Sequence, residues 1–147
     1  MPYQSKLAAV LFQRKRNEEE ASRVFLTSKN ILISEQEQLH LLDNKLQATL
    51  DDLTEKQAGG STSYEMALYF RFIEMFRGRV EAQRKAVFNQ EHVCEAKRAL
   101  LEISVKERKA VEIIEEKRKN EYLKAVAKKE QAVLDEIGGQ LRLRHHA

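Results

Sequence analysis

Glycine and proline, the residues that most often form turns, are almost absent from this chain of 147 residues. The only proline is Pro2, no glycine occurs between residues 3 and 58, and Gly78 is the single glycine between residues 61 and 137. A compact sheet protein needs turn residues at intervals of about eight to twelve positions. The sequence therefore excludes sandwiches, barrels and doubly wound folds, and it leaves long helices.

The composition agrees with long helices, because Ala, Leu, Glu, Lys, Gln and Arg dominate and have the highest helix propensities. No apolar run approaches the roughly 18 residues of a membrane span, and the run LAAVLF at residues 7–12 is too short for a signal peptide. The net charge of +3 is the difference between 26 basic and 23 acidic residues, which does not indicate an anionic partner. We therefore expect a cytoplasmic protein.

The cluster from Gly59 to Ser63 is the one internal group of turn residues, and it divides the chain into two helices. We expect the first helix over residues 3–57, a turn over 58–63 and a second helix over 64–137, with Ser63 as its N-terminal cap. A second pair, Gly138 and Gly139, is expected to end that helix and leave a frayed tail over residues 138–147.

Both helices carry an apolar stripe with a seven-residue period. In the first helix the stripe comprises Leu7, Leu11, Arg14, Glu18, Ala21, Phe25, Ser28, Leu32, Glu35, Leu39, Leu42, Leu46, Thr49 and Leu53. In the second it comprises Met66, Tyr69, Ile73, Phe76, Val80, Gln83, Val87, Gln90, Cys94, Lys97, Leu101, Ser104, Arg108, Val111, Glu115, Arg118, Tyr122 and Ala125. Joined by so short a turn, the helices are predicted to form an all-α fold, a single antiparallel coiled-coil hairpin over residues 1–147.

The stripe changes character along its length. It is apolar near the turn, and the single cysteine, Cys94, fits it as a buried small side chain. Farther from the turn it carries Arg14, Glu18, Lys97, Arg108 and Glu115. We therefore expect tight packing near the turn and weak pairing at the end that bears both termini.

The second helix is the longer, so part of it should overhang the first. A hairpin that pivots near residue 61 brings residue 3 close to residue 119, and residues 120–137 then extend past the first helix by about 25 to 30 Å. The apolar side chains of this overhang have no partner within the chain. They are Tyr122, Val126, Val133, Leu134 and Ile137.

Aromatic residues crowd the start of the second helix. Five of the ten Tyr and Phe residues lie between Tyr64 and Phe76, and one stripe cannot bury all of them. Tyr69 and Phe76 fit the seam, whereas Phe72 lies about 100° from Ile73 around the helix. Two interpretations remain open: a wide core beside the turn, or an exposed patch that docks another protein.

No motif for catalysis occurs, since the sequence has no phosphate-binding loop, no CxxC pair, no HExxH helix and no GxSxG elbow. A two-helix hairpin also buries too little surface to enclose a catalytic pocket. Basic clusters near both termini alternate with acidic residues and lack interleaved aromatic residues, so nucleic acid is not an expected partner. We expect no enzyme activity, cofactor or metal site.

Several short motifs resemble the flagellar export protein FliJ family over nearly the whole chain. They are the Gln- and Leu-rich segment at residues 34–42, the Gly/Ser turn, the step of Tyr69, Phe72 and Ile73, the Gln83-Arg84 pair and the Leu-Asp-Glu run at 134–136. The resemblance implies a component of the flagellar type III export apparatus, similar in shape to the central stalk subunit of rotary ATPases.

The resemblance also implies two partners. The terminal end would enter the pore of the hexameric export ATPase, through Leu7, Leu11, Tyr122, Val126 and Leu134. A patch near the turn would bind the cytoplasmic domain of the export gate protein FlhA, through Gln38, Leu42, Tyr69, Phe72 and Phe76. Within that patch the chain departs from the family pattern, because Phe76 and Arg79 stand where small or aliphatic residues are usual, and Gly78 lies beside them.

Further expectations follow from the same resemblance. Export chaperones are possible partners, and the protein would be held at the inner membrane of the flagellar basal body only through other proteins. From the seam itself, which one chain already satisfies near its turn, we expect a monomer when the protein is on its own. An injectisome rod, a rotary-ATPase stalk subunit and a general coiled-coil adaptor would show similar heptads, and they remain alternatives at this stage.

Overall fold

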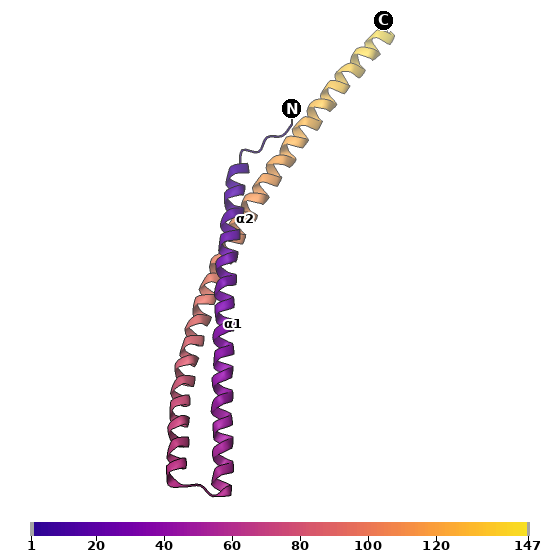
Figure 1. Cartoon of the computed structure of the whole chain (residues 1–147). Helices are drawn as coiled ribbons and strands as arrows, with labels where there is room; N and C mark the ends of the chain where they lie inside the picture. The colour runs from indigo at the N-terminus through magenta and orange to yellow at the C-terminus, as the bar shows by residue number, and fades with distance from the viewer. Residues whose placement is uncertain (1, 147) are drawn as a thin grey trace. The chain divides into compact units, whose positions relative to one another are not determined.

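The computed structural model describes residues 2–146 and contains two helices, α1 (Ala8–Gly59) and α2 (Ser63–His146). No strand occurs in that part of the chain. The chain divides into two compact units. The turn unit comprises residues 20–102, and the terminal unit comprises residues 2–19 together with 103–146. Figure 1 shows the turn unit as α1 and α2 running side by side from the connection between them.

The two helices of the turn unit are antiparallel. The Gln83 side chain of α2 donates a hydrogen bond to the Glu35 carbonyl of α1. Two turns farther along α2, Gln90 donates to the carbonyl of Ser28, which lies two turns earlier in α1. Partners whose numbers fall in one helix as they rise in the other define an antiparallel pair. The predicted all-α fold, with two long helices in a coiled-coil hairpin, is confirmed.

The start of α1 differs from the prediction, which began the helix at residue 3. Residues 2–7 form an arm outside the helix, in which the Leu7 amide donates to Ser5 Oγ at 3.2 Å. The Leu11 amide then donates to the Leu7 carbonyl at 2.8 Å, and this is the first of the backbone hydrogen bonds of the helix. A serine hydroxyl that takes a backbone donor offers the chain an alternative to the helix, and here the arm results from it.

The connection is shorter than the predicted turn over residues 58–63. Gly60 has a φ of +80°, the left-handed conformation that ends many helices and that only glycine adopts without strain. The cap of α2 is Thr62 rather than Ser63, because the Glu65 amide donates to Thr62 Oγ1 at 3.2 Å. The Met66 amide donates to the Thr62 carbonyl at 3.1 Å.

The predicted end of α2 at residue 137 is wrong. The helix continues through Gly138 and Gly139 to His146, so the expected frayed tail is helical as far as the structure describes it. A glycine in a helix costs about 1 kcal/mol relative to alanine but leaves the backbone hydrogen bonds intact. A stop of the kind seen at the connection requires the left-handed conformation, and among residues 2–146 the only glycine with positive φ is Gly60.

The heptad seam agrees closely with the pattern of burial. All positions predicted for the first seam are buried or half-buried, as are those of the second from Met66 to Glu115. The exceptions, Arg118 and Ala125, are exposed. Among the side chains that the structure describes, residues 2–145, the buried apolar ones are all in the turn unit: Leu53, Ile73, Val80 and Val87. Burying a side chain of this size stabilises the fold by about 1.5–3 kcal/mol, so packing is best near the turn, as predicted.

Candidate protein-binding surfaces

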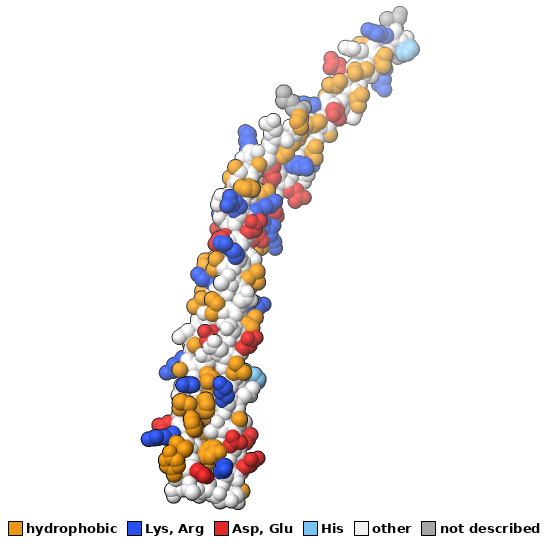
Figure 2. All heavy atoms as spheres, viewed as in Figure 1, with side chains coloured by type: hydrophobic (Ala, Val, Ile, Leu, Met, Phe, Trp, Pro, Cys, Tyr) orange, Lys and Arg blue, Asp and Glu red, His pale blue; other side chains and the backbone are white. Residues whose placement is uncertain are grey.

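The aromatic residues after the turn are too many for the seam. Ile73 points into it and is 5% exposed, whereas Phe72, its neighbour, is 50% exposed. Phe70 and Tyr64 are also exposed. Positions next to a seam residue are rotated by about 100°, so these rings lie on the flanks of α2. Figure 2 shows hydrophobic side chains gathered at the end of the turn unit that bears the connection.

The five residues predicted to bind the export gate fall into two groups. Gln38 and Phe72 are exposed, whereas Leu42, Tyr69 and Phe76 are half-buried in the seam. The structure brings Tyr69 and Phe72 together in one shallow concavity. The same concavity is lined by Lys56, Glu65 and Leu68, which the sequence reasoning did not single out.

Polar residues in the seam of the turn unit fix the register of its helices. Gln83 Nε2 donates to the Glu35 carbonyl at 2.9 Å and also to the Glu35 carboxylate. Gln90 Nε2 donates to the carbonyl of Ser28, a buried serine, at 3.0 Å. A slip of α2 along α1 would leave these groups without partners in a partly dry seam, and an unsatisfied buried polar group is costly.

The terminal unit pairs its seam charges. Arg108 Nε donates to the Glu18 carboxylate across the seam, and Arg108 Nη1 donates to Glu112 at 2.8 Å. These hydrogen bonds raise the pKa of the Arg108 guanidinium, and the one to Glu18 has the largest effect. A second ion pair between the two helices joins Arg14 Nη1 to Glu107 Oε2 at 2.8 Å. The expectation of weak pairing at this end is therefore wrong for these charges, because opposite charges face each other.

The N-terminal arm packs on α2. The rings of Tyr3 and Tyr122 lie 5.4 Å apart at an angle of 47°. Partial burial raises the pKa of the Tyr3 hydroxyl, and the nearby Glu115 carboxylate raises it further. Glu115 Oε2 is itself buried and has no hydrogen-bond partner within residues 2–146. Tyr122 was expected to be unpartnered, and this contact with Tyr3 corrects that expectation.

Beyond this contact, α2 is exposed almost to its end. Val126 is half-buried, and from residue 127 to residue 145 every residue except Gly138 is exposed. Apolar side chains are included, with Leu134 61% exposed and Val133 54% exposed. Figure 1 shows this part of α2, in yellow, continuing past the N-terminus with no helix beside it within the terminal unit. The predicted overhang is therefore present.

Of the five residues predicted to bind the ATPase, only Leu134 is openly exposed. Leu7, Leu11, Tyr122 and Val126 are half-buried. Five further large apolar residues of the overhang are exposed: Leu123, Val133, Ile137, Leu141 and Leu143. Leu141 follows Ile137 by four residues, so the helical period alone could have identified it. The prediction missed it because Gly138 and Gly139 were interpreted as a helix end.

Sites of other kinds are not found in the described residues. No three His, Cys, Asp or Glu side chains among residues 2–145 come together to hold a metal ion. Neither helix, over the same range, contains a stretch long and apolar enough to cross a bilayer. Cys94 is a free thiol and is half-buried in the seam.

A family model for the flagellar FliJ protein matches residues 3–146 of this chain. The chain belongs to the FliJ family. The resemblance found in the sequence is thereby confirmed, and this member of the FliJ family is a stalk-like, structural component of type III protein export.

One solved structure, a protein from Chlamydia trachomatis described as a YscO homolog, is similar to this FliJ-family chain with a TM-score of 0.54 and 22% sequence identity. The match covers 98% of each chain. At that identity the likeness supports the helical hairpin fold. The comparison with curated proteins gives no match.

Proposed function

We propose that this protein couples two parts of the flagellar export apparatus, the hexameric export ATPase and the export gate protein FlhA. The terminal unit binds the ATPase and the turn unit binds the gate. The protein acts in the cytoplasm, at the inner membrane of the flagellar basal body, and reaches the membrane only through its partners. Export chaperones are further partners.

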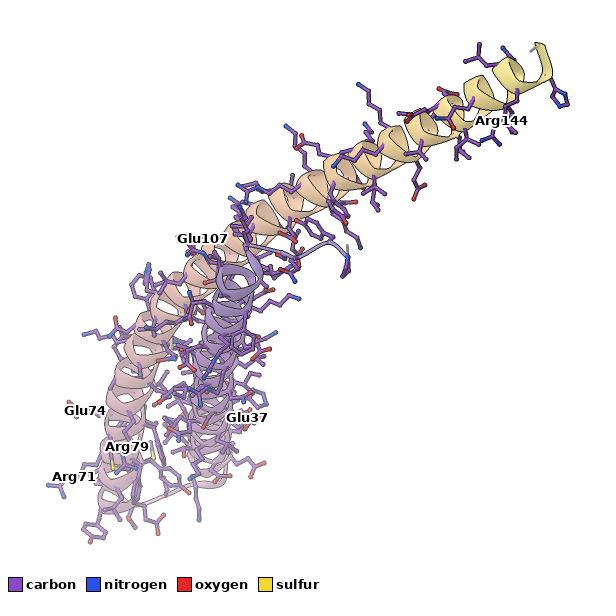
Figure 3. All side chains as sticks on the ribbon, turned by 90° about the horizontal axis from the view of Figure 1, so that it is seen from above. Glu37, Arg71, Glu74, Arg79, Glu107 and Arg144 are labelled. Atoms are coloured by element: carbon purple, nitrogen blue, oxygen red, sulfur yellow. The ribbon has the colours of Figure 1, made fainter. Side chains whose placement is uncertain are left out.

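The observation that carries the ATPase assignment is the overhang of α2. Its apolar side chains are exposed along nearly twenty residues, and a helix that remains in solvent does not need them. A single helix about 10 Å wide fits the axis of a ring, and exposed leucines supply the anchors for apolar pore residues. In the sequence Arg142 and Arg144 alternate with Leu141 and Leu143. Figure 3 labels Arg144 close to the end of this segment.

The gate assignment rests on the concavity at Tyr69 and Phe72. An aromatic ring that is half exposed next to a seam residue can insert into a partner without disturbing the hairpin. Lys56 and Glu65 provide a charged rim of both signs. This arrangement, an apolar centre with a polar edge, is typical of protein interfaces.

A truncated chain, residues 1–126, tests the ATPase assignment. It keeps the contact between Tyr3 and Tyr122 and removes the exposed overhang. We expect its thermal melting to match that of the full chain, because the removed residues pack on nothing, and we expect it to lose stimulation of the export ATPase. Full stimulation by the truncated chain would contradict the proposal.

A point variant sharpens the test. Leu134→Glu places a charge on the apolar anchor of the overhang, and Ala132→Glu places the same charge on an exposed neighbour rotated by about 200° around the helix. Leu134→Glu is expected to weaken ATPase stimulation much more than Ala132→Glu. Equal effects of the two variants would mean that charge alone, rather than the apolar face, is responsible.

A further inference from the structure

The last part of α2 contains an eleven-residue repeat. Residues 122–132 and 133–143 each have large apolar side chains at the first, second and fifth positions and a small residue at the sixth. The matching pairs are Tyr122 with Val133, Leu123 with Leu134, Val126 with Ile137 and Ala127 with Gly138. Eleven residues complete about three helical turns, so equivalent positions share one face of α2 and lie about 16 Å apart along it. This face of α2 therefore presents a similar surface twice.

The N-terminal arm covers this face where the repeat begins. The Tyr3 ring lies 5.4 Å from the ring of Tyr122, and both residues are half-buried. Burial raises the pKa of the Tyr3 hydroxyl, the Glu115 carboxylate raises it further and Arg118 opposes the shift, so both charged groups lie near the Tyr3 ring. We refer to Glu115, Arg118 and Tyr122 as the first ring site. Figure 1 shows the arm reaching α2 well before the yellow end of the helix.

A second site of similar construction lies one repeat farther along α2. The residues eleven positions after those of the first ring site are Val126, Lys129 and Val133, which we refer to as the second ring site. A shallow concavity is present here, and its lining consists of Lys129, Glu130, Val133 and Leu134. Val133 is 54% exposed and Leu134 is 61% exposed, so this site is open where the first one is occupied.

The two ring sites share a cation and an apolar residue. Arg118 in the first site corresponds to Lys129 in the second, and Tyr122 corresponds to Val133. A cation beside the face of an aromatic ring attracts the ring, and an apolar side chain in contact with the ring stabilises it by burial. The second ring site therefore has the chemistry to bind an aromatic side chain.

The two ring sites differ in the group that lies near the ring's hydroxyl. Val126 of the second site stands where the first site has Glu115. A carboxylate offers an acceptor to a phenol, whereas a valine side chain offers none. A hydroxyl placed against valine loses its hydrogen bonds to water without replacement, which is costly. The second ring site therefore favours phenylalanine over tyrosine.

The arm also indicates how such a ring is presented. Residues 2–7 lie outside the helix, and within them the Leu7 amide donates to Ser5 Oγ at 3.2 Å. A short segment without helical structure is thus sufficient to hold a ring on this face of α2. The occupant of the second ring site needs no helix of its own.

We propose that the second ring site binds a phenylalanine side chain from a non-helical segment of the protein that receives the overhang. Under the proposed function this protein is the export ATPase, and that part of the inference rests on the proposed function. The preference for phenylalanine rests only on the repeat and on the occupied first site.

Peptides that copy the arm test the second ring site in the full chain. The probe has the sequence of residues 2–7 with Tyr3→Phe, and the comparison peptides carry the natural Tyr3 or Tyr3→Ala. At millimolar concentration the phenylalanine peptide is expected to shift the methyl NMR signals of Val133 and Leu134. The tyrosine peptide is expected to bind about fivefold more weakly, and the alanine peptide is expected to leave both signals unchanged.

A variant of the second ring site tests the reason for the preference. Val126→Glu supplies the carboxylate of the first site, so it is expected to reverse the order and make the tyrosine peptide the tighter binder. The matched control is Gln131→Glu, an exposed position about 140° from Val126 around the helix, which is expected to leave the order unchanged. Circular dichroism confirms that both variants are folded.

The same two variants test the partner. Val126→Glu is expected to weaken stimulation of the export ATPase several-fold, because the ring of the partner then meets a charge. Gln131→Glu is expected to preserve stimulation. The truncated chain, residues 1–126, reports separately on whether the overhang acts on the ATPase at all.

The outcomes of these experiments are distinct. Absence of shifts at Val133 and Leu134, or equal shifts with the alanine peptide, overturns the second ring site whatever the ATPase shows. Equal binding of the phenylalanine and tyrosine peptides overturns the preference and is the result expected if the natural arm of another copy is the occupant. Full stimulation by Val126→Glu, when the truncated chain has lost stimulation, overturns the assignment of the ring to the ATPase.

Discussion

Arg108 of α2 and Glu18 of α1 form an ion pair within the seam of the terminal unit, where their side chains are 21% and 25% exposed. Arg108 also holds Glu112, one turn farther along its own helix, so one guanidinium serves two carboxylates. Both seam residues lie at positions where a coiled coil normally has apolar side chains. The pair therefore fixes which part of α2 lies beside the start of α1.

Removing one member of this pair is predicted to destabilise the terminal unit more than removing both. Arg108→Leu leaves the Glu18 carboxylate partly desolvated and without its partner across the seam, which lowers the melting temperature. Glu18→Leu combined with Arg108→Leu replaces the pair by apolar contact and is expected to recover the melting temperature of the natural chain or exceed it. Thermal melting followed by circular dichroism measures both.

The control for this cycle is Arg98→Leu, because Arg98 pairs with Glu95 on the surface of α2 and its side chain is 51% exposed. Ion pairs in that setting contribute little to stability. We expect a small change for this variant. A double variant no more stable than Arg108→Leu would show that the seam does not tolerate apolar residues at these positions.

Phe72 and Ile73 are neighbours with opposite predicted roles. Ile73→Ala removes a buried side chain and is expected to cost about 2–4 kcal/mol of unfolding free energy. Phe72→Ala removes an exposed ring, and we expect a loss of less than about 1 kcal/mol. If Phe72 anchors the export gate, the same change weakens gate binding by about 2 kcal/mol or more. Chemical denaturation and a binding titration measure these values.

The contrary result for this pair is equally clear. A large loss of stability for Phe72→Ala with gate binding intact would falsify the assignment of Phe72 to a docking surface. The ring would then belong to a wide core beside the turn, the other interpretation that the sequence left open.

The two glycines of the connection are predicted to respond in opposite directions to alanine. Gly60 has a φ of +80°, which an alanine adopts only with strain, so Gly60→Ala should destabilise the chain by about 1–2 kcal/mol. Gly59 is helical, and a Cβ there meets nothing within 4 Å. Gly59→Ala should therefore stabilise the chain by about 0.5–1 kcal/mol. Chemical denaturation measures both, and equal effects of the two changes would contradict the assigned turn geometry.

The N-terminal arm is predicted to detach at alkaline pH. The pKa of Tyr3 is raised because partial burial and Glu115 both disfavour the tyrosinate, whereas Arg118 has the smaller opposing effect. A group whose pKa is raised on folding contributes stability that is fully present below its unfolded pKa, about 10 for tyrosine, and that is lost as pH rises through the folded pKa. Tyr3→Phe removes this dependence and keeps the ring against Tyr122.

Melting temperatures measured across the alkaline range compare the two chains. The natural chain is expected to lose more stability than Tyr3→Phe as the pH rises above the ordinary tyrosine value. The same dependence in both chains would assign the effect to another group.

Heptad spacing was sufficient to predict which residues meet in the seam. Leu53, Ile73, Val80 and Val87 were all placed there by a period of 3.5, and all four are buried. The period is a property of the chain that does not depend on distant contacts, because side chains three and four residues apart share a face of any helix. The short turn then leaves the antiparallel hairpin as the one way to bury both stripes.

Helix ends were predicted less well. Glycine pairs occur at residues 59–60 and at 138–139, and only the first ends a helix. The difference is that the chain must turn back at Gly60 to bury the stripe of α2 against α1. The free energy gained by that burial offsets the conformational cost of the left-handed turn. At Gly138 no such contact is available, so the helix continues at a small local cost.

The sequence by itself therefore determined the two helices, the turn and the composition of the seam, since these follow from residue spacing and from local propensity. Only the tertiary structure decided how the seam charges are satisfied, with Arg108 on Glu18, and which apolar residues remain uncovered, such as Phe72 and Leu134. The physical reason is that pairing and exposure depend on the register between the helices. Register is set by the sum of contacts such as those of Gln83 with Glu35 and Gln90 with Ser28, which lie far apart in the chain.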